Sequence, residues 1–305
     1  MSYSNSIIFG PIPSRRFGIS LGIDLSPSKK QCNFDCLYCE LEAAKTVDKM
    51  TEYPSVNEVI SEIKKSFDKH PKIDVITLTA NGEPTLYPHL DELIDEINKI
   101  KGDTKTLILS NGSTIYDEKI YKALLKIDTV KLSLDCVSQK CFKKLDRNHD
   151  GIDINKIIKS MISFRKDTKN IFVLEVLFVK TLNDKEDEIE ALYDSIKKIN
   201  PHRVDIGTID RPPAYKVKPV DFELLEKVAN TFKGINVNIA FKNRPKQTQN
   251  FDEKEIISML KRRPLTKEDI ENMFDDSSKN ILETLIKSGV VSLVDSSGLN
   301  FYKIL

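Results

Sequence analysis

The residues best suited to chemistry are three cysteines that stand close together, Cys32, Cys36 and Cys39. Thiolates spaced as C-x3-C-x2-C surround one soft metal centre, because side chains so near in sequence cannot all reach separate partners. Three ligands would leave one iron of a [4Fe-4S] cube open, as catalytic metal sites keep one position free. A structural zinc site completed by Cys136, Cys141 or a distant histidine is the alternative, although zinc sites more often use two close pairs.

The elements that must position these thiols alternate between short β-branched runs and longer amphipathic stretches. The predicted strands are 19–25, 73–79, 106–110, 130–134, 171–179, 204–207 and 237–241. The predicted helices between them are 55–69, 88–100, 116–125, 155–166, 185–199 and 221–232. Repeated strand–helix units need right-handed crossovers and a parallel sheet. We therefore expect an α/β fold, a partial (β/α)6 TIM-like barrel.

In a barrel, chemistry belongs at the carboxyl ends of the strands. Polar side chains do follow the predicted strands directly, at Asn81–Pro84, Ser110–Ser113, Asp135 and Asp210–Pro213. Glu175 is different, because it stands inside a strand run, where a charge is costly unless it is paired. It is a candidate for the barrel interior, with an outward-facing partner of a helix lysine as the alternative.

The chain divides, on this reading, into a barrel over residues 1–241, a polar linker over 242–252 and a small domain over 253–305. Three short predicted helices, 253–261, 266–273 and 277–287, precede two strand-like runs, 290–294 and 300–304. This order is typical of a winged helix-turn-helix. The sequence from Asp252 onward contains eight basic and ten acidic residues, and this acid excess argues against simple binding to duplex DNA. A basic strip at Lys242, Arg244, Lys246 and 261–263 could still meet folded RNA.

The run CNFDCLYC from Cys32 to Cys39 resembles the cluster motif of the radical S-adenosylmethionine enzymes. The resemblance covers roughly residues 10–240 and implies a partial barrel whose cysteine loop follows its first strand. It implies a [4Fe-4S] cluster on Cys32, Cys36 and Cys39 whose open iron binds S-adenosyl-L-methionine. It further implies cleavage to methionine and a 5′-deoxyadenosyl radical that abstracts hydrogen from substrate, driven by an external one-electron reductant such as flavodoxin or ferredoxin.

Further positions follow from the same resemblance. Asn81-Gly82-Glu83-Pro84 is similar to the family's Gly-Gly-Glu-Pro motif, which holds the methionine amino group, with Asn81 in place of the commonest first glycine. The implied cofactor-binding residues are Tyr38, Asn81, Gly82, Glu83, Ser110, Asn111, Ser133 and Asp135. The residue that acts on the substrate itself is not indicated.

A narrower resemblance lies before the cysteines, in the stretch GPIPSRRFG from Gly10 to Gly18. It is similar to a subgroup related to the wyosine-tRNA synthases, and implies tRNA base modification. Arg15, Arg16 and Arg211 could bind phosphate or carboxylate at the barrel mouth and are candidate substrate residues, with structural ion pairs as the alternative. Glu175 is a further candidate substrate residue. This chain lacks the second cysteine triplet of those synthases, so Cys136 and Cys141 are expected to be buried thiols. Radical modification of a peptide or protein docked on the C-terminal domain is one alternative. A non-catalytic, redox-sensing DNA-binding regulator is another.

Composition sets the broad class. Lys plus Arg total 47 and Asp plus Glu 46, a net charge of +1, so bulk charge would not hold the chain to nucleic acid or a membrane. No run approaches the roughly 18 apolar residues of a membrane span, and the start lacks a signal-peptide core. Five cysteines, three of them crowded together, suit a reducing compartment rather than a disulfide scaffold. A cytoplasmic location is expected.

Overall fold

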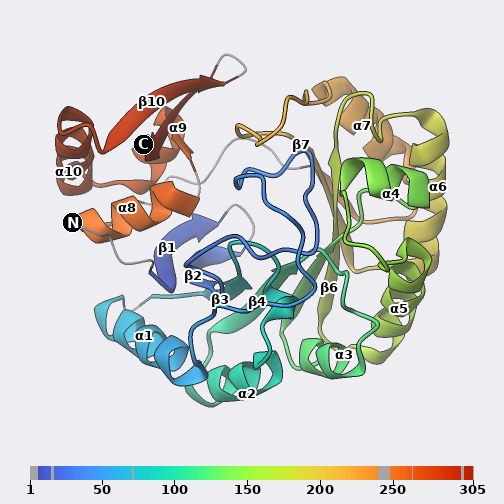
Figure 1. Cartoon of the computed structure of the whole chain (residues 1–305), viewed down its shortest axis with the longest axis horizontal. Helices are drawn as coiled ribbons and strands as arrows, with labels where there is room; N and C mark the ends of the chain where they lie inside the picture. Colours follow the sequence, from blue (N-terminus) through green and yellow to red (C-terminus); the bar gives the residue numbers. More distant parts are fainter. Residues whose placement is uncertain are drawn as a thin grey trace.

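The computed structural model describes residues 6–14, 17–70, 72–239, 248–262, 264–296 and 299–304 (Figure 1). Its main feature is an eight-stranded sheet in which the strands lie in the order of the sequence. They are β1 (Ile8–Ser14), β2 (Gly18–Asp24), β3 (Val75–Thr79), β4 (Lys105–Ser110), β5 (Thr129–Ser133), β6 (Ile171–Phe178), β7 (Arg203–Thr208) and β8 (Val237–Ile239). From β2 to β8 every pairing is parallel, and β1 pairs antiparallel with β2.

Helices follow the strands and cover the outer side of the curved sheet (Figure 1). They are α1 (Val56–Lys69), η1 (Pro84–Leu86), α2 (Leu90–Ile100), α3 (Glu118–Leu124), α4 (Gln139–Leu145), α5 (Ile154–Asp167), α6 (Glu186–Ile199) and α7 (Phe222–Thr231). The start of α1 shows why a helix begins where it does. Ser55 accepts from the Glu58 N–H while the Glu58 carboxylate accepts from the Ser55 N–H, so a capping box satisfies two backbone donors.

The predicted α/β architecture with a mostly parallel sheet is confirmed, since each predicted strand overlaps an observed parallel strand. The elements that were not predicted are β1, η1 and α4 in the barrel and β9 in the C-terminal part. The run that forms β1 contains Pro11 and Pro13, which have no backbone N–H to donate to a neighbouring strand, so its sequence does not indicate a strand. Its place at the edge of the sheet resolves the conflict, because an edge strand has one side on which no donor is required.

The C-terminal elements form a second, smaller core. They are α8 (Glu253–Arg262), β9 (Leu265–Thr266), α9 (Lys267–Met273), α10 (Asp276–Lys287), β10 (Val291–Ser296) and β11 (Leu299–Ile304), with the strands in the order β10-β11-β9. Phe251, Phe274 and Leu285 are buried between them. Phe251 belongs to the stretch predicted as linker, and it packs fully into this core. Residues 242–247 of that stretch lie outside the described residues.

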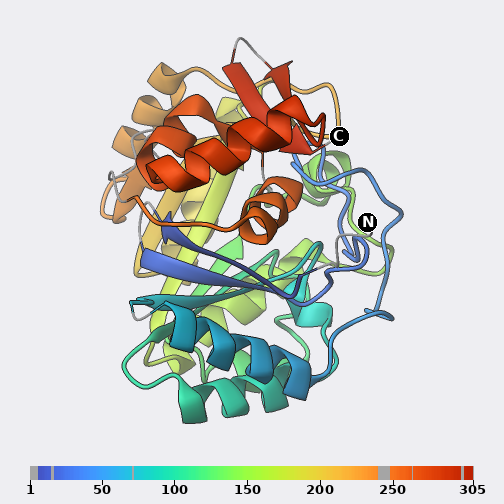
Figure 2. The same ribbon diagram turned by 90° about the vertical axis from the view of Figure 1, so that its left-hand side faces the viewer.

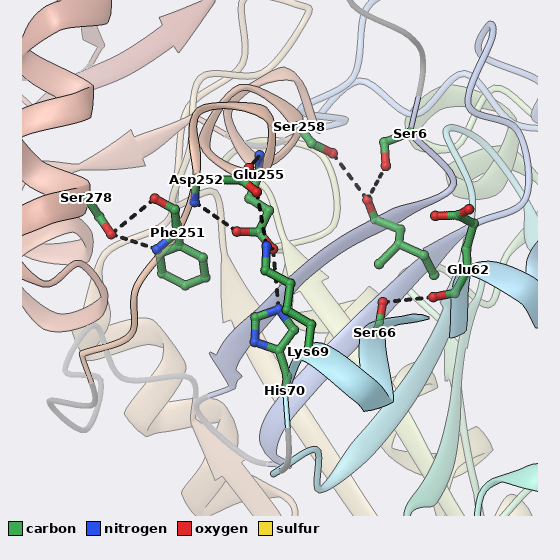
Figure 3. Close-up of polar contacts among 11 residues, drawn as sticks. Ser6, Glu62, Ser66, Lys69, His70, Phe251, Asp252, Glu255, Ser258 and Ser278 are labelled. Carbon is green, nitrogen blue, oxygen red and sulfur yellow. Dashed lines mark hydrogen bonds and ion pairs between the residues drawn. The ribbon is translucent and has the colours of Figure 1, made fainter. Parts of the chain in front are cut away.

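The C-terminal core is joined to the barrel through β1, beside which α8 lies (Figure 2). Ile12 of β1 is buried among the C-terminal apolar side chains, and Ser258 donates to the Ile8 carbonyl at 3.4 Å. At the end of α1, Lys69 contacts Asp252 at 3.0 Å and Glu255 at 2.7 Å (Figure 3). One strand is therefore shared by the two cores. None of the helices in the described residues is long and apolar enough to span a bilayer.

Candidate active site

The three cysteines lie together in the long loop that leaves the carboxyl end of β2. All three are free and half-buried. The loop is held from behind by the segment after α4, because Asp35 N–H donates to the Asp146 carbonyl at 3.1 Å and Leu37 N–H to the Leu145 carbonyl at 2.9 Å. A tight turn closes between Cys36 and Cys39, whose N–H donates to the Cys36 carbonyl at 3.1 Å.

The spread of the three thiols tests which metal group they fit. Two thiolates on one tetrahedral zinc, with Zn–S bonds of about 2.3 Å, lie only about 3.8 Å apart. In the described residues, the group of three ligand atoms that all lie within 4.8 Å of one another is Cys136, Cys141 and Glu188. The thiols of Cys32, Cys36 and Cys39 therefore spread more widely than one ion requires. Three soft donors around a wider space fit an iron–sulfur cube that binds each cysteine through a different iron.

Burial keeps these thiols protonated without a metal. Desolvation raises the pKa of Cys32 to about 12 and moves the pKa of Cys36 well above its ordinary value. The pKa of Cys39 rises for the same reason, although the nearby Lys30 ammonium opposes the rise. A thiolate is the form that binds metal, so the charge of a metal group is what this site needs to stabilise three thiolates at once.

Each thiol has different neighbours. The Phe34 N–H donates to Cys32 Sγ at 3.4 Å, and Asn111 Nδ2 lies 3.8 Å from the same sulfur. Cys36 Sγ lies 3.5 Å from a carboxyl oxygen of Asp146, whereas Lys30 Nζ lies 3.5 Å from Cys39 Sγ. Burial raises the pKa of Asp146 well above its ordinary value, so Cys36 has a protonated carboxyl group beside it, whereas Cys39 has a cation beside it.

The loop after β3 pairs with the cysteine loop through its backbone. Gln31 N–H donates to the Asn81 carbonyl and Glu83 N–H to the Gln31 carbonyl, both at 2.9 Å. Gly82, between them, has a φ of +135°, and a Cβ at this position would lie 1.9 Å from the Gln31 carbonyl oxygen. Only glycine fits this close approach, which explains the glycine of the predicted motif.

Glu83 is buried, and its carboxylate is hydrogen-bonded to neighbouring residues of the protein. Its carboxylate accepts from the Thr85 N–H at 2.9 Å, the Thr85 hydroxyl at 2.6 Å, the Ser110 hydroxyl at 2.7 Å and the Asn111 N–H at 2.8 Å. Burial raises the pKa of Glu83, and these donors oppose the rise. Glu83 thus joins the loop after β3 to the loop after β4 and fixes Asn111 beside Cys32.

Ser133, the last residue of β5, and Asp135, two residues further on, line the same small space as Tyr38. The Tyr38 hydroxyl donates to Asp135, which also accepts from the Leu177 N–H at 2.7 Å. Burial raises the pKa of Asp135 to about 7. Both Ser133 and Asp135 line a small enclosed space with Phe34 and Asp146, separate from the larger cavity of the barrel. Asp135 therefore holds the Tyr38 ring in place.

The barrel encloses an interior cavity of about 580 Å³, with walls formed by the inward faces of β1 to β7. Of the predicted site residues, those that line it are Tyr38, Cys39, Asn81, Gly82, Glu175 and Arg211. The other described ones do not line it: Cys32, Cys36, Glu83, Ser110, Asn111, Ser133 and Asp135. Another hollow, of about 770 Å³, lies outside the barrel beside α6 and α7, and none of these residues reaches it.

A charged layer that crosses three strands was not predicted. Lys131 of β5 pairs with Glu175 of β6 and lies 3.3 Å from Asp205 of β7. Lys131 and Glu175 line the cavity, and the Glu175 side chain is 42% exposed. Of the two positions considered for Glu175, the barrel interior and an outward-facing pair with a helix lysine, the structure shows the first. Lys131 and Asp205 were missed because their partners depend on the register of strands distant in sequence, although a charge within each strand run is the available signal.

The loop after β7 closes over the cysteine loop. Arg211 contacts Glu40 at 3.0 Å, Ala214 N–H donates to the Cys39 carbonyl at 2.8 Å, and the Tyr215 hydroxyl donates to Asp35 at 2.6 Å. Of the predicted arginines, Arg211 therefore lies next to Cys39, within the site. Arg15 and Arg16 lie outside the described residues.

Cys136 and Cys141 differ from their expectation as buried thiols, because they form a disulfide. Cys136 lies in the loop between β5 and α4 and Cys141 in the first turn of α4, and their Cα atoms are 5.6 Å apart. A disulfide sulfur has no thiolate to offer. The zinc alternative that used one of these residues as a fourth ligand is therefore excluded in this form of the protein.

The profile of the Radical SAM superfamily matches residues 27–207. The chain is 42% identical over 299 residues to a "UPF0026 protein" of Helicobacter pylori (strain J99), covering 97% of each. Its fold is similar to that of Streptococcus suis SuiB bound to the precursor peptide SuiA, with a TM-score of 0.59, 18% identity, and coverage of 76% of this chain and 50% of the other. A structure of TYW1 with a lysine–pyruvate adduct gives a TM-score of 0.54 at 15% identity, over 93% of this chain and 80% of the other.

Proposed function

Because the chain belongs to the radical SAM superfamily, whose enzymes use a [4Fe-4S] cluster and S-adenosylmethionine, we propose that Cys32, Cys36 and Cys39 hold this cluster. When bound, the cluster and cosubstrate supply a 5′-deoxyadenosyl radical that abstracts hydrogen from substrate. The observation that carries the proposal is the set of three free thiols in one loop, of which Cys39 lines the interior cavity.

The residues around the thiols would bind and orient the cosubstrate. Asn81 and Gly82 line the cavity beside Cys39, where the glycine lets the backbone come close to a ligand. Tyr38 forms part of the same wall, and Asp135 holds its ring. Glu83, whose oxygens accept four protein hydrogen bonds, acts as a positioning residue for Ser110 and Asn111. Asp135 acts as a positioning residue for Tyr38, and Ser133 stays a candidate cofactor-binding residue from the sequence.

For the substrate we propose a tRNA base. A cavity of about 580 Å³ that also receives the cosubstrate has room for a single inserted group, as when one nucleotide is flipped out of its stack. Glu175 and Arg211 reach this space and would contact the group that enters. Arg15 and Arg16 stay candidates from the sequence alone.

The C-terminal elements would form the docking module. Their order, α8-β9-α9-α10 followed by the β10–β11 hairpin, supports a winged helix-turn-helix, and the division into residues 1–241, 242–252 and 253–305 is proposed with it. A peptide or protein substrate is the second candidate, favoured by the acid excess of the C-terminal residues. Membership in a superfamily of enzymes supports both over a non-catalytic regulator.

The test is release of 5′-deoxyadenosine by anaerobically reconstituted protein under strong reduction, followed by chromatography. We expect about four irons per chain and product from the wild type. Cys36→Ala should give neither, whereas Cys141→Ala, outside the proposed site, should keep both. Product formation by Cys36→Ala at the wild-type rate would refute the assignment.

The substrate is tested separately by mass spectrometry of tRNA nucleosides from a strain that lacks the gene. Loss of one modified nucleoside, restored by the wild type but not by Cys36→Ala, is expected. An unchanged nucleoside profile would count for the peptide candidate.

A further inference from the structure

On the side of α4, the residue that contacts the cysteine loop is followed directly in sequence by an exposed residue. Asp146, which follows this helix, contacts Cys36 Sγ at 3.5 Å and holds the loop through the N–H of Asp35. The next residue, Arg147, has a side chain that is 43% exposed. Any redox group on Cys36 is therefore reached from outside over a very short path through this segment.

The surface at this point is basic. Lys140, Lys143 and Lys144 of α4 are exposed, at helical spacings of three and four residues. Arg147, two residues beyond the end of the helix, is exposed as well, and we call these four residues the α4 face. Asp150 is the exposed acid in the same segment. Within the described parts of the chain, no carboxylate pairs with the three lysines, whereas Arg147 contacts Asp35 at 3.2 Å. The α4 face thus keeps most of its positive charge available.

The α4 face and the cavity lie on different sides of the cysteine loop. Tyr38 and Cys39 line the interior cavity, and among the described residues that line it neither Cys36 nor Asp146 is found. Asp146 instead borders the small separate space together with Phe34 and Phe142. A group entering the barrel therefore meets the loop at Cys39, and a molecule on the α4 face meets it at Cys36.

We propose that the α4 face docks an acidic one-electron carrier protein of the flavodoxin or ferredoxin class. The inference rests on the proposed cluster. One electron passes from the reduced flavin or iron–sulfur group of the carrier to the oxidised cluster, so the carrier loses one electron, the cluster gains one and no bond breaks. Complementary charge is the usual means of guiding such brief encounters, whose interfaces are small. The base of an RNA substrate would instead enter the interior cavity, which meets the cysteine loop at Tyr38 and Cys39.

The experiment is stopped-flow reduction of the reconstituted protein by reduced flavodoxin at low salt, followed by the absorbance of the oxidised cluster. The double variant Lys143→Glu/Lys144→Glu should react about tenfold more slowly or worse, since opposite charge is worth at least that much in association rate. Added salt should reduce the difference. Photoreduced deazaflavin, a small reductant, should reduce variant and wild type equally.

The matched control is Lys197→Glu/Lys198→Glu, which reverses two exposed lysines in the last turn of α6 as the test variant does in α4. It should be reduced by flavodoxin at the wild-type rate. An unchanged flavodoxin rate in the α4 variant would overturn the proposal, as would equal slowing in the α6 control. Weaker tRNA binding with normal reduction would also overturn it and make the α4 face an RNA surface. Iron analysis separates these outcomes from failure of the cluster proposal, which would show as absent iron.

Discussion

At the scale of single residues, the three thiols are chemically unequal. Cys36 lies beside the carboxyl group of Asp146, whose pKa burial raises well above its ordinary value, and Cys39 lies beside the Lys30 ammonium. Reduction adds negative charge to a cluster, so a nearby cation stabilises the reduced form and a nearby anion destabilises it. Lys30 thus favours reduction at the corner that faces the cavity.

Lys30→Met should therefore lower the midpoint potential of the cluster, because the reduced state loses its neighbouring positive charge. The measurement is a redox titration followed by electron paramagnetic resonance. Lys30→Arg should retain the wild-type potential, and so should Lys45→Met, which removes an exposed lysine of the same loop. An unchanged or raised potential in Lys30→Met would show that the contact has no electrostatic effect.

Asp135 gives a pH dependence to the stability of the protein without its cluster. Burial raises its pKa from 3.8 to about 7, so between these values the folded chain binds a proton that the unfolded chain has released. The free energy of unfolding attributable to Asp135 therefore falls as pH rises through this window. The free energy of unfolding is measured in urea at about pH 5 and at about pH 8. Its value should differ less between the two pH values in Asp135→Asn than in the wild type. Asp194→Asn, an exposed acid, should leave this difference unchanged.

At the scale of elements, four loops build the site, and they are joined by backbone contacts and by the Glu83 side chain. The loop after β3 pairs with the cysteine loop at Gln31, the loop after β4 is joined through Glu83, and the loop after β7 closes over Cys39. The tightest of these contacts is at Gly82, where no side chain fits.

Gly82→Ala should consequently prevent stable formation of the site. A Cβ only 1.9 Å from the Gln31 carbonyl forces the two loops apart. We expect a loss of at least about 3 kcal/mol in the free energy of unfolding and no bound iron. Gly102→Ala is the control, since Gly102 also has a positive φ but nothing lies within 4 Å of its Cβ position. It should cost only about 1–2 kcal/mol and keep the iron. Similar losses in both variants would mean that backbone strain, not the clash, limits Gly82.

The sequence was informative where chemistry is local. Cys32, Cys36 and Cys39 share one loop, and the polar residues after β3 and β4 meet because parallel strands end at one edge. Contacts between distant positions could not be predicted. The layer of Lys131, Glu175 and Asp205 depends on the register of three strands, and the contact of Tyr215 with Asp35 depends on the path of a long loop.

At the scale of the whole molecule, β1 connects the C-terminal core to the barrel. Phe9 and Pro13 line the interior cavity, whereas Ile12 also packs against the C-terminal apolar side chains. The polar contacts at this junction, from Lys69 to Asp252 and Glu255, are half-exposed (Figure 3). Apolar burial should therefore hold the two cores together, with ion pairs adding little.

Ile12→Ala should lower the free energy of unfolding by about 2–4 kcal/mol, because it leaves a void in a buried junction. Lys69→Ala should cost less than about 1 kcal/mol, as expected of a screened surface pair. Urea denaturation of the full chain measures both. A larger loss in Lys69→Ala than in Ile12→Ala would show that charge, rather than packing, fastens the C-terminal core.

We propose that three cysteines hold a cluster whose fourth iron stays open to S-adenosylmethionine. The most direct measurement is the electron paramagnetic resonance spectrum of the reduced, reconstituted protein with and without this cosubstrate. We predict the signal of a reduced [4Fe-4S] cluster that changes its shape and g values when S-adenosylmethionine is added. An identical spectrum with and without it, or a protein that binds zinc and no iron, would contradict the account.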